Sequence, residues 1–109
     1  MTYKLFIDDE RHPITYDWEI VRSSQEAILA IKKLGMPKEI SFDHDLGGED
    51  TSIPFIWYII NEFLDGNLTW PENFKYSVHS QNPIGKENIK KLMDGFLASE
   101  IYPLKGLYE

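Results

Sequence analysis

The 109-residue sequence contains no cysteine, so disulfide bonds, zinc–thiolate sites and cysteine nucleophiles are excluded. Long apolar runs are also missing, because the longest, residues 53–60, is far shorter than the roughly 20 residues of a membrane span. No signal-peptide pattern precedes the first strand-like run, so we expect a cytoplasmic protein without membrane contact. Basic residues are few, with 11 Lys and Arg against 18 Asp and Glu. An extended nucleic-acid surface is therefore not expected, since it needs clustered cations.

Hydrophobic residues make up 42% of the sequence and aromatic residues 14%, which is typical of a folded globular chain. A chain of this length buries a core without disulfides or structural metals. We find no internal repeat and no linker-like segment. The sequence therefore predicts one domain over residues 1–109.

Four short apolar runs have the length and composition of buried strands, at residues 3–7, 18–21, 38–42 and 74–78. Three helices are predicted at residues 24–34, 54–65 and 83–97, preceded or ended by residues typical of helix termini such as Ser23, Gly35, Gly66 and Asn82. In the second helix, Ile56, Trp57, Ile60, Phe63 and Leu64 are predicted to face inward. The order predicts an α/β domain with an open parallel sheet and no helix between its first two strands.

The C-terminal residues 101–108 are apolar and aromatic but are interrupted by Pro103 and Gly106. They are either a fifth, edge strand or a docked tail. The sheet is therefore expected to have four or five strands. The same tail is a candidate contact for a homodimer.

Polar clusters stand directly after three of the predicted strands: Asp8-Asp9-Glu10-Arg11, Asp43-His44-Asp45 and His79-Ser80-Gln81-Asn82. Arg22-Ser23, directly after the strand at residues 18–21, is a weaker fourth cluster. The carboxyl ends of parallel strands share one edge of a sheet, and ligands bind along that edge. We therefore expect the three clusters to meet at one site.

Carboxylates at two neighbouring strand ends suit a hard divalent cation, which retains several waters and leaves room for a phosphate oxygen. Asp8, Asp9 and Asp43 are the candidate ligands of Mg²⁺ or Mn²⁺, with Asp45 as an outer candidate. The alternative is that these aspartates only begin loops and cap helices. Arg11 would either pair with them or bind an anion.

His79 is the first candidate for proton transfer, because histidine titrates near neutral pH, and His44 ranks below it. The third helix begins just after His79, and a helix N-terminus favours anions. Ser80, Asn82, Gly85 and Lys86 surround this start. We expect Gly85 to let a ligand approach the backbone and Lys86 to stabilise phosphoryl charge.

Three segments together resemble the cyclic-phosphate-processing receiver-like domain family, an offshoot of the response-regulator receiver fold. They are residues 6–11 (FIDDER), 41–47 (SFDHDLG) and 79–85 (HSQNPIG). The similarity extends over about residues 3–97. It implies a three-layer, flavodoxin-like fold with an acidic metal pocket and a role on cyclic phosphates of nucleotides or RNA ends.

By position, the resemblance places Asp8, Asp9 and Asp43 in that pocket, with Asp45, His44, His79, Ser80, Asn82 and Lys86 around it. Ordinary receivers carry a helix after the first strand and a lysine at the end of a fifth strand, and both are missing from the predicted pattern. The sequence therefore favours a metal-dependent phosphoesterase acting on a small phosphate-containing substrate. The alternative is a non-catalytic receiver-like module that binds a metal, a nucleotide or a partner protein.

Overall fold

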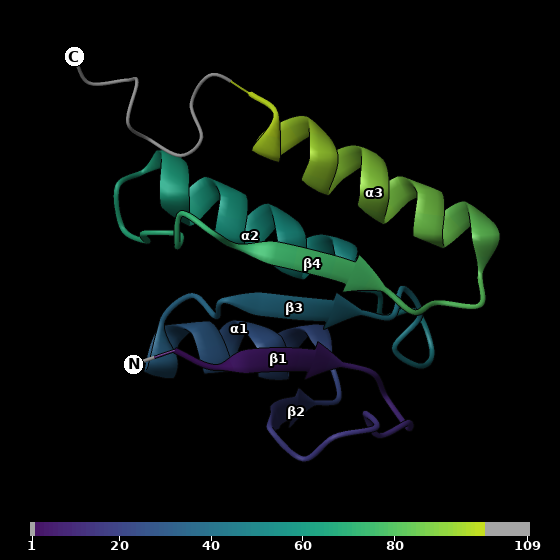
Figure 1. Cartoon of the computed structure of the whole chain (residues 1–109). Coiled ribbons are helices and arrows are strands. Elements are labelled where there is room, and N and C mark those ends of the chain that lie inside the picture. The colour runs from purple at the N-terminus through teal and green to yellow at the C-terminus, as the bar shows by residue number, and fades with distance from the viewer. Residues whose placement is uncertain (1, 100–109) are drawn as a thin grey trace.

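The computed structural model describes residues 2–99, which form a parallel sheet of four strands and three helices (Figure 1). The elements follow in the order β1 (Lys4–Ile7), β2 (Trp18–Val21), α1 (Ser24–Leu34), β3 (Glu39–Phe42), α2 (Ile53–Leu64), β4 (Lys75–Val78) and α3 (Pro83–Leu97). The strands lie side by side in the order β2-β1-β3-β4, and all neighbours are parallel. The predicted α/β class and the parallel four-stranded sheet are confirmed, and the predicted strands differ from the observed ones by one residue at most. The predicted edge strand or docked tail at 101–108 lies outside the described residues.

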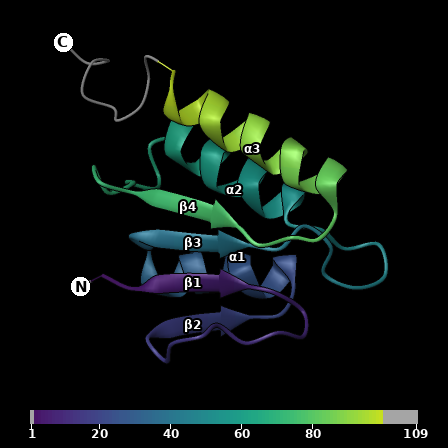
Figure 2. The same cartoon turned by 45° about the vertical axis from the view of Figure 1, so that its right-hand side comes forward.

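One hydrophobic core joins the sheet to all three helices. Figure 2 shows α3 alongside α2, with α1 behind β1 and β3. It takes Leu5 and Ile7 from β1, and each helix contributes at least two buried side chains: Ala27 and Ile31 from α1, five residues from α2, and Ile89 and Met93 from α3. The connections β2–α1–β3 and β3–α2–β4 both advance in the same direction across the sheet. Right-handed crossovers therefore place α1 and α2 on the same face.

The opposite face of the sheet carries alternate strand residues, among them Lys4, Phe6, Ser41 and Ser77, and none of these belongs to the common core. Residues 2–99 thus form two layers, where the resemblance implied three. The reason is the missing helix after β1: the chain passes from β1 to β2 through the loop at residues 8–17. That loop and the bare face border the site described below.

Helix α2 buries a different set of side chains from the one predicted. Ile56, Ile60 and Phe63 are buried as expected, together with Phe55 and Ile59, whereas the predicted inward residues Trp57 and Leu64 are about half exposed. Residues 57 and 64 are two helical turns apart and share one flank. The core-facing stripe is centred between residues 56 and 59, so that flank lies toward solvent.

The predicted starts of α1 and α3 are confirmed by their hydrogen bonds. The Ser23 hydroxyl accepts from the Glu26 amide at 3.0 Å, and the Glu26 carboxylate accepts from the Arg22 amide at 2.8 Å. The Asn82 side chain accepts from the Gly85 amide at 3.0 Å at the start of α3. None of the helices between residues 2 and 99 is long and apolar enough to cross a membrane.

Candidate functional site

Asp8, Asp43 and His79 each stand one residue beyond a strand, and their amides continue the ladders of the sheet. The Asp43 amide donates to the Ile7 carbonyl at 2.9 Å, and the His79 amide donates to the Phe42 carbonyl at 2.8 Å. The residues two positions earlier, Phe6, Ser41 and Ser77, project from the same face. A side-chain atom from each of Asp8, Asp43 and His79 therefore lies within 4.8 Å of the other two, although residues 8 and 79 are far apart in the sequence.

The Asp8 side chain is completely buried, and both of its carboxylate oxygens are hydrogen-bonded. Oδ1 accepts from the amides of Glu10 at 2.9 Å and Arg11 at 2.8 Å, whereas Oδ2 faces Arg11 Nε at 2.9 Å and His79 Nε2 at 3.0 Å. Burial alone would raise the pKa of Asp8. The hydrogen bonds from the two amides and His79, together with the Arg11 charge, outweigh burial and leave that pKa below its usual value.

The guanidinium of Arg11 joins the two buried aspartates. Its Nη2 lies 3.3 Å from Asp43 Oδ2 and donates to the His79 carbonyl at 3.4 Å, while its Nε holds Asp8. The other Asp43 oxygen accepts from the His44 amide at 2.9 Å. The predicted pairing of Arg11 with the aspartates is therefore present in the structure, and its positive charge compensates two neighbouring carboxylates.

Both ring nitrogens of His79 contact other side chains. Nε2 faces Asp8, and Nδ1 lies 2.7 Å from the Ser41 hydroxyl. The ring also stacks on Phe6, with centroids 4.5 Å apart. Burial lowers the pKa of His79, and the favourable interaction with Asp8 does not fully compensate. The ring is therefore neutral at pH 7, and we infer that Nε2 donates to Asp8 while Nδ1 accepts from Ser41.

A polar cleft of about 530 Å³ opens beside these residues. Its lining residues come from all three predicted clusters and the 47–48 loop: Asp9, Glu10, Arg11, Asp43, Asp45, Gly47, Gly48, Ser80, Gln81 and Asn82. Four carboxylates against one guanidinium make the cleft negative, which favours a divalent cation. The predicted meeting of the three clusters at one edge of the sheet is therefore observed.

His44, Asp45 and Asn82 hold the loop after β3 against the start of α3. Asp45 Oδ1 lies 3.0 Å from His44 Nδ1, and Asp45 Oδ2 accepts from the Asn82 amide group at 3.1 Å. A Cβ atom on Gly85 would stand 2.4 Å from Cγ of His44. The close approach predicted at Gly85 is thus made by the His44 ring, and the space there is not available to a ligand.

The remaining predicted residues divide between the cleft and another hollow. Ser80 lines the cleft, and its hydroxyl accepts from the backbone amide of Asn82 at 3.1 Å. Lys86 lines a separate hollow of about 350 Å³ between β4 and α3, together with Lys90 and Asp94. The structure therefore does not bring Lys86 into the acidic cleft, because its position in the first turn of α3 directs it to the outer edge of the sheet.

Two residues that the sequence analysis did not single out, Ser41 and Phe6, support the site, together with Arg22 from the weaker fourth cluster. Ser41 contacts His79, Phe6 stacks on it, and Arg22 Nη1 donates to the carbonyls of Asp8 at 3.0 Å and Arg11 at 2.7 Å. Ser41 and Phe6 could have been found by strand alternation, since each precedes a site aspartate by two residues. The position of Arg22 after β2 predicts that it lies at this edge of the sheet, whereas nothing local in the sequence indicates its contact with the carbonyls of Asp8 and Arg11.

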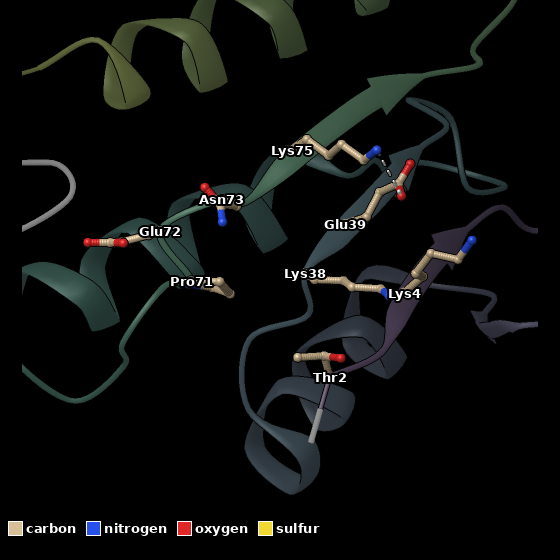
Figure 3. Close-up of a pocket in the computed structure, with 8 residues that line it drawn as sticks. All are labelled: Thr2, Lys4, Lys38, Glu39, Pro71, Glu72, Asn73 and Lys75. Atoms are coloured by element: carbon tan, nitrogen blue, oxygen red, sulfur yellow. Dashed lines mark ion pairs between the residues drawn. The ribbon is translucent and has the colours of Figure 1, made fainter.

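Another hollow, of about 550 Å³, lies at the opposite end of the strands (Figure 3). It is lined by residues from the starts of β1, β3 and β4, including Lys4, Glu39 and Lys75. Lys75 and Glu39 form an ion pair at 3.9 Å, which the dashed line in Figure 3 marks. None of the sequence-predicted site residues lines this hollow.

A comparison with protein-family models gives one finding for this chain. A model described as "Cyclic-phosphate processing Receiver domain" matches residues 3–95. No curated protein and no solved structure gives a significant match.

Proposed function

The chain belongs to the cyclic-phosphate processing receiver domain family, and from this membership we propose that it is a metal-dependent phosphoesterase that opens a cyclic phosphate on a nucleotide or RNA end. The family match supports cyclic-phosphate processing as the general role. The acidic cleft at the carboxyl ends of β1, β3 and β4 is the observation that carries the more specific proposal.

The residues of the cleft fit Mg²⁺ or Mn²⁺. Asp9 is exposed at the cleft and Asp43 reaches it, so their oxygens are the accessible ligands. Asp8 lies behind them, fully buried with both oxygens hydrogen-bonded, so in our proposal it becomes a ligand when the cation displaces Arg11 from its Oδ2. Asp45 keeps an outer role, since its two oxygens contact His44 and Asn82. When bound, the cation would polarise a phosphoryl oxygen and orient a water.

Hydrolysis of a cyclic phosphate forms a bond between the water oxygen and phosphorus and breaks one ester P–O bond. The attacking water gives up one proton to the solvent, and the leaving oxygen takes up one proton from it. Arg11 lines the cleft with a fixed positive charge and is the group we assign to phosphate oxygens. His79 is neutral, and its nitrogens contact Asp8 and Ser41. We therefore assign His79 as a positioning residue that orients Asp8, in place of the proton transfer expected from the sequence.

The test is turnover of 2′,3′-cyclic nucleotides, RNA with a cyclic-phosphate end and 3′,5′-cyclic nucleotides, each with Mg²⁺, with Mn²⁺ and with EDTA. We expect metal-dependent opening of a cyclic phosphate that is lost in Asp43→Asn. Absence of turnover from the whole panel by folded, metal-binding protein would contradict the proposal.

The role of His79 is tested with Ser41→Ala and His79→Gln. Ser41→Ala frees Nδ1 and leaves the contact of His79 with Asp8 in place. If His79 only positions Asp8, the pH profile of kcat is unchanged in Ser41→Ala, and His79→Gln retains part of the activity. A shift of the pH profile in Ser41→Ala, with complete loss in His79→Gln, would instead identify His79 as the proton-transfer group.

A second function is favoured by the position of Asp43, which follows the central strand β3 and lines the cleft. In a receiver-like signalling module, this carboxylate would attack the phosphorus of acetyl phosphate and release acetate. Against it, no lysine lines the cleft in the part of the chain that the structure describes. Incubation with acetyl phosphate and Mg²⁺ tests it, because a stable mass adduct that disappears in Asp43→Asn would favour signalling.

A further inference from the structure

A mostly apolar hollow of about 430 Å³ lies directly beside the acidic cleft. Phe6 and Trp18 from the sheet and Pro13 and Ile14 from the loop after β1 line it, and Arg11 and His79 stand between it and the carboxylates. Arg11 lines both the hollow and the cleft. A single ligand can therefore place an apolar part in the hollow and a charged group in the cleft.

The aromatic wall of this hollow is held in place before any ligand binds. The Trp18 indole donates to the Thr15 hydroxyl at 3.1 Å and packs edge-on against Phe6, with centroids 5.8 Å apart. The Lys4 ammonium lies 4.5 Å from the centre of the Trp18 ring. These contacts orient the ring at little further entropic cost, which favours binding of a flat partner.

The apolar residues around the hollow lie outside the core cluster that joins the sheet to the helices, although Phe6 itself is buried at 8% exposure. Phe6 and Trp18 lie on the face of the sheet opposite the helices, and neither belongs to the core cluster. Ile14 is 99% exposed. Burial in the protein interior therefore does not explain why this segment carries an isoleucine beside two aromatic rings, whereas contact with an apolar ligand does.

We propose that this hollow binds the base of a nucleotide whose phosphate group lies in the acidic cleft, an inference that rests on the proposed function of that cleft. A nucleotide joins a flat ring with apolar faces to a phosphate over a short distance, and the apolar hollow and the charged cleft lie side by side in the same way. Aromatic and apolar side chains bind any base through its face. The hollow therefore selects nucleotides over phosphodiesters that lack a base and discriminates little among the bases.

The test compares two exposed apolar residues of the same loop. Ile14 lines the hollow, whereas Tyr16, which is also fully exposed, does not. Both are replaced by aspartate, and binding of adenosine 3′-monophosphate, ribose 5-phosphate and inorganic phosphate is measured by calorimetry with Mg²⁺. We expect Ile14→Asp to weaken the nucleotide by about tenfold, within the range for loss of a base-stacking contact. Tyr16→Asp should bind it like the wild type, and neither change should affect inorganic phosphate.

The nuclear magnetic resonance signal of the Trp18 indole N–H reports directly on ligand binding in the hollow. This signal is assigned as the one that disappears in Trp18→Phe. We expect adenosine 3′-monophosphate, and more weakly adenosine alone, to shift this signal, whereas ribose 5-phosphate leaves it unchanged. An unmoved Trp18 signal, or equal weakening by Ile14→Asp and Tyr16→Asp, would overturn the inference.

Failure of the proposed function has a different signature. Nucleotide binding at Trp18 without turnover of any cyclic phosphate would contradict the phosphoesterase proposal and support the base-binding proposal. Turnover of ethylene phosphate, a cyclic diester without a nucleoside, at the same kcat/KM as a 2′,3′-cyclic nucleotide would contradict the hollow and leave the phosphoesterase standing.

Discussion

Replacing Arg11 by methionine removes the guanidinium that holds Asp8 and Asp43 together and keeps most of the aliphatic stem. Asp8 is fully buried and loses the contact of its Oδ2 with Arg11 Nε at 2.9 Å. A hydrogen bond to a charged group contributes about 1.5–3 kcal/mol. Because the Arg11 side chain is 42% exposed and screened by solvent, the lower half of that range applies. The longer contact to Asp43 adds little, so we expect a loss of about 2 kcal/mol in the free energy of unfolding.

The same substitution leaves two carboxylates facing each other without their shared cation, so Mg²⁺ should bind more tightly than in the wild type. Urea unfolding with and without MgCl₂ measures both effects. At a Mg²⁺ concentration ten times the Kd, a ligand that binds the folded state alone contributes about 1.4 kcal/mol. Added Mg²⁺ should therefore recover most of the stability lost in Arg11→Met.

Arg22→Met is the matched control, because Arg22 supports the same loop through the carbonyls of Asp8 and Arg11. It should also destabilise the protein, but without any additional recovery by Mg²⁺ relative to wild type. The reasoning is refuted if Arg11→Met costs less than about 0.5 kcal/mol. It is refuted equally if Mg²⁺ stabilises the two variants to the same extent.

Two further predictions concern packing and pH. Gly85→Ala should lower the free energy of unfolding by about 1–3 kcal/mol, measured by thermal unfolding, because its Cβ would meet the His44 ring at 2.4 Å. The control is Gly95→Ala in the same helix, whose Cβ meets nothing within 4 Å and which should be neutral or stabilising. An unchanged stability of Gly85→Ala would contradict this packing. Burial lowers the pKa of His79 from 6.5, so stability should be complete above about pH 6.5 and decrease below it. The lowered pKa of Asp8 adds a second loss below about pH 3.8. His79→Gln should remove the first loss and retain the second in urea unfolding measured against pH; persistence of the first would assign it to another group.

Local sequence patterns determined the elements of this protein and the place of its site. Apolar runs, capping residues such as Ser23 and Asn82, and glycine at position 35 predict strands and helices that match the structure closely. These signals act within a few residues, where backbone sterics and hydrogen bonds operate. The polar clusters after three strands likewise predicted the edge where they meet, because parallel strands align their carboxyl ends.

Tertiary structure decided what each of those polar residues contacts. The pairing of Asp8 with His79 joins residues 71 positions apart, and the contact of Ser41 with His79 spans 38. The His44 ring against Gly85 and the absence of Lys86 from the cleft depend likewise on how α3 packs beside β4. Such contacts follow from strand order and helix packing, and these are determined by many weak interactions along the whole chain. A local pattern identifies a residue's position along its own strand or helix, and the neighbour across the fold is set by the packing of the other elements.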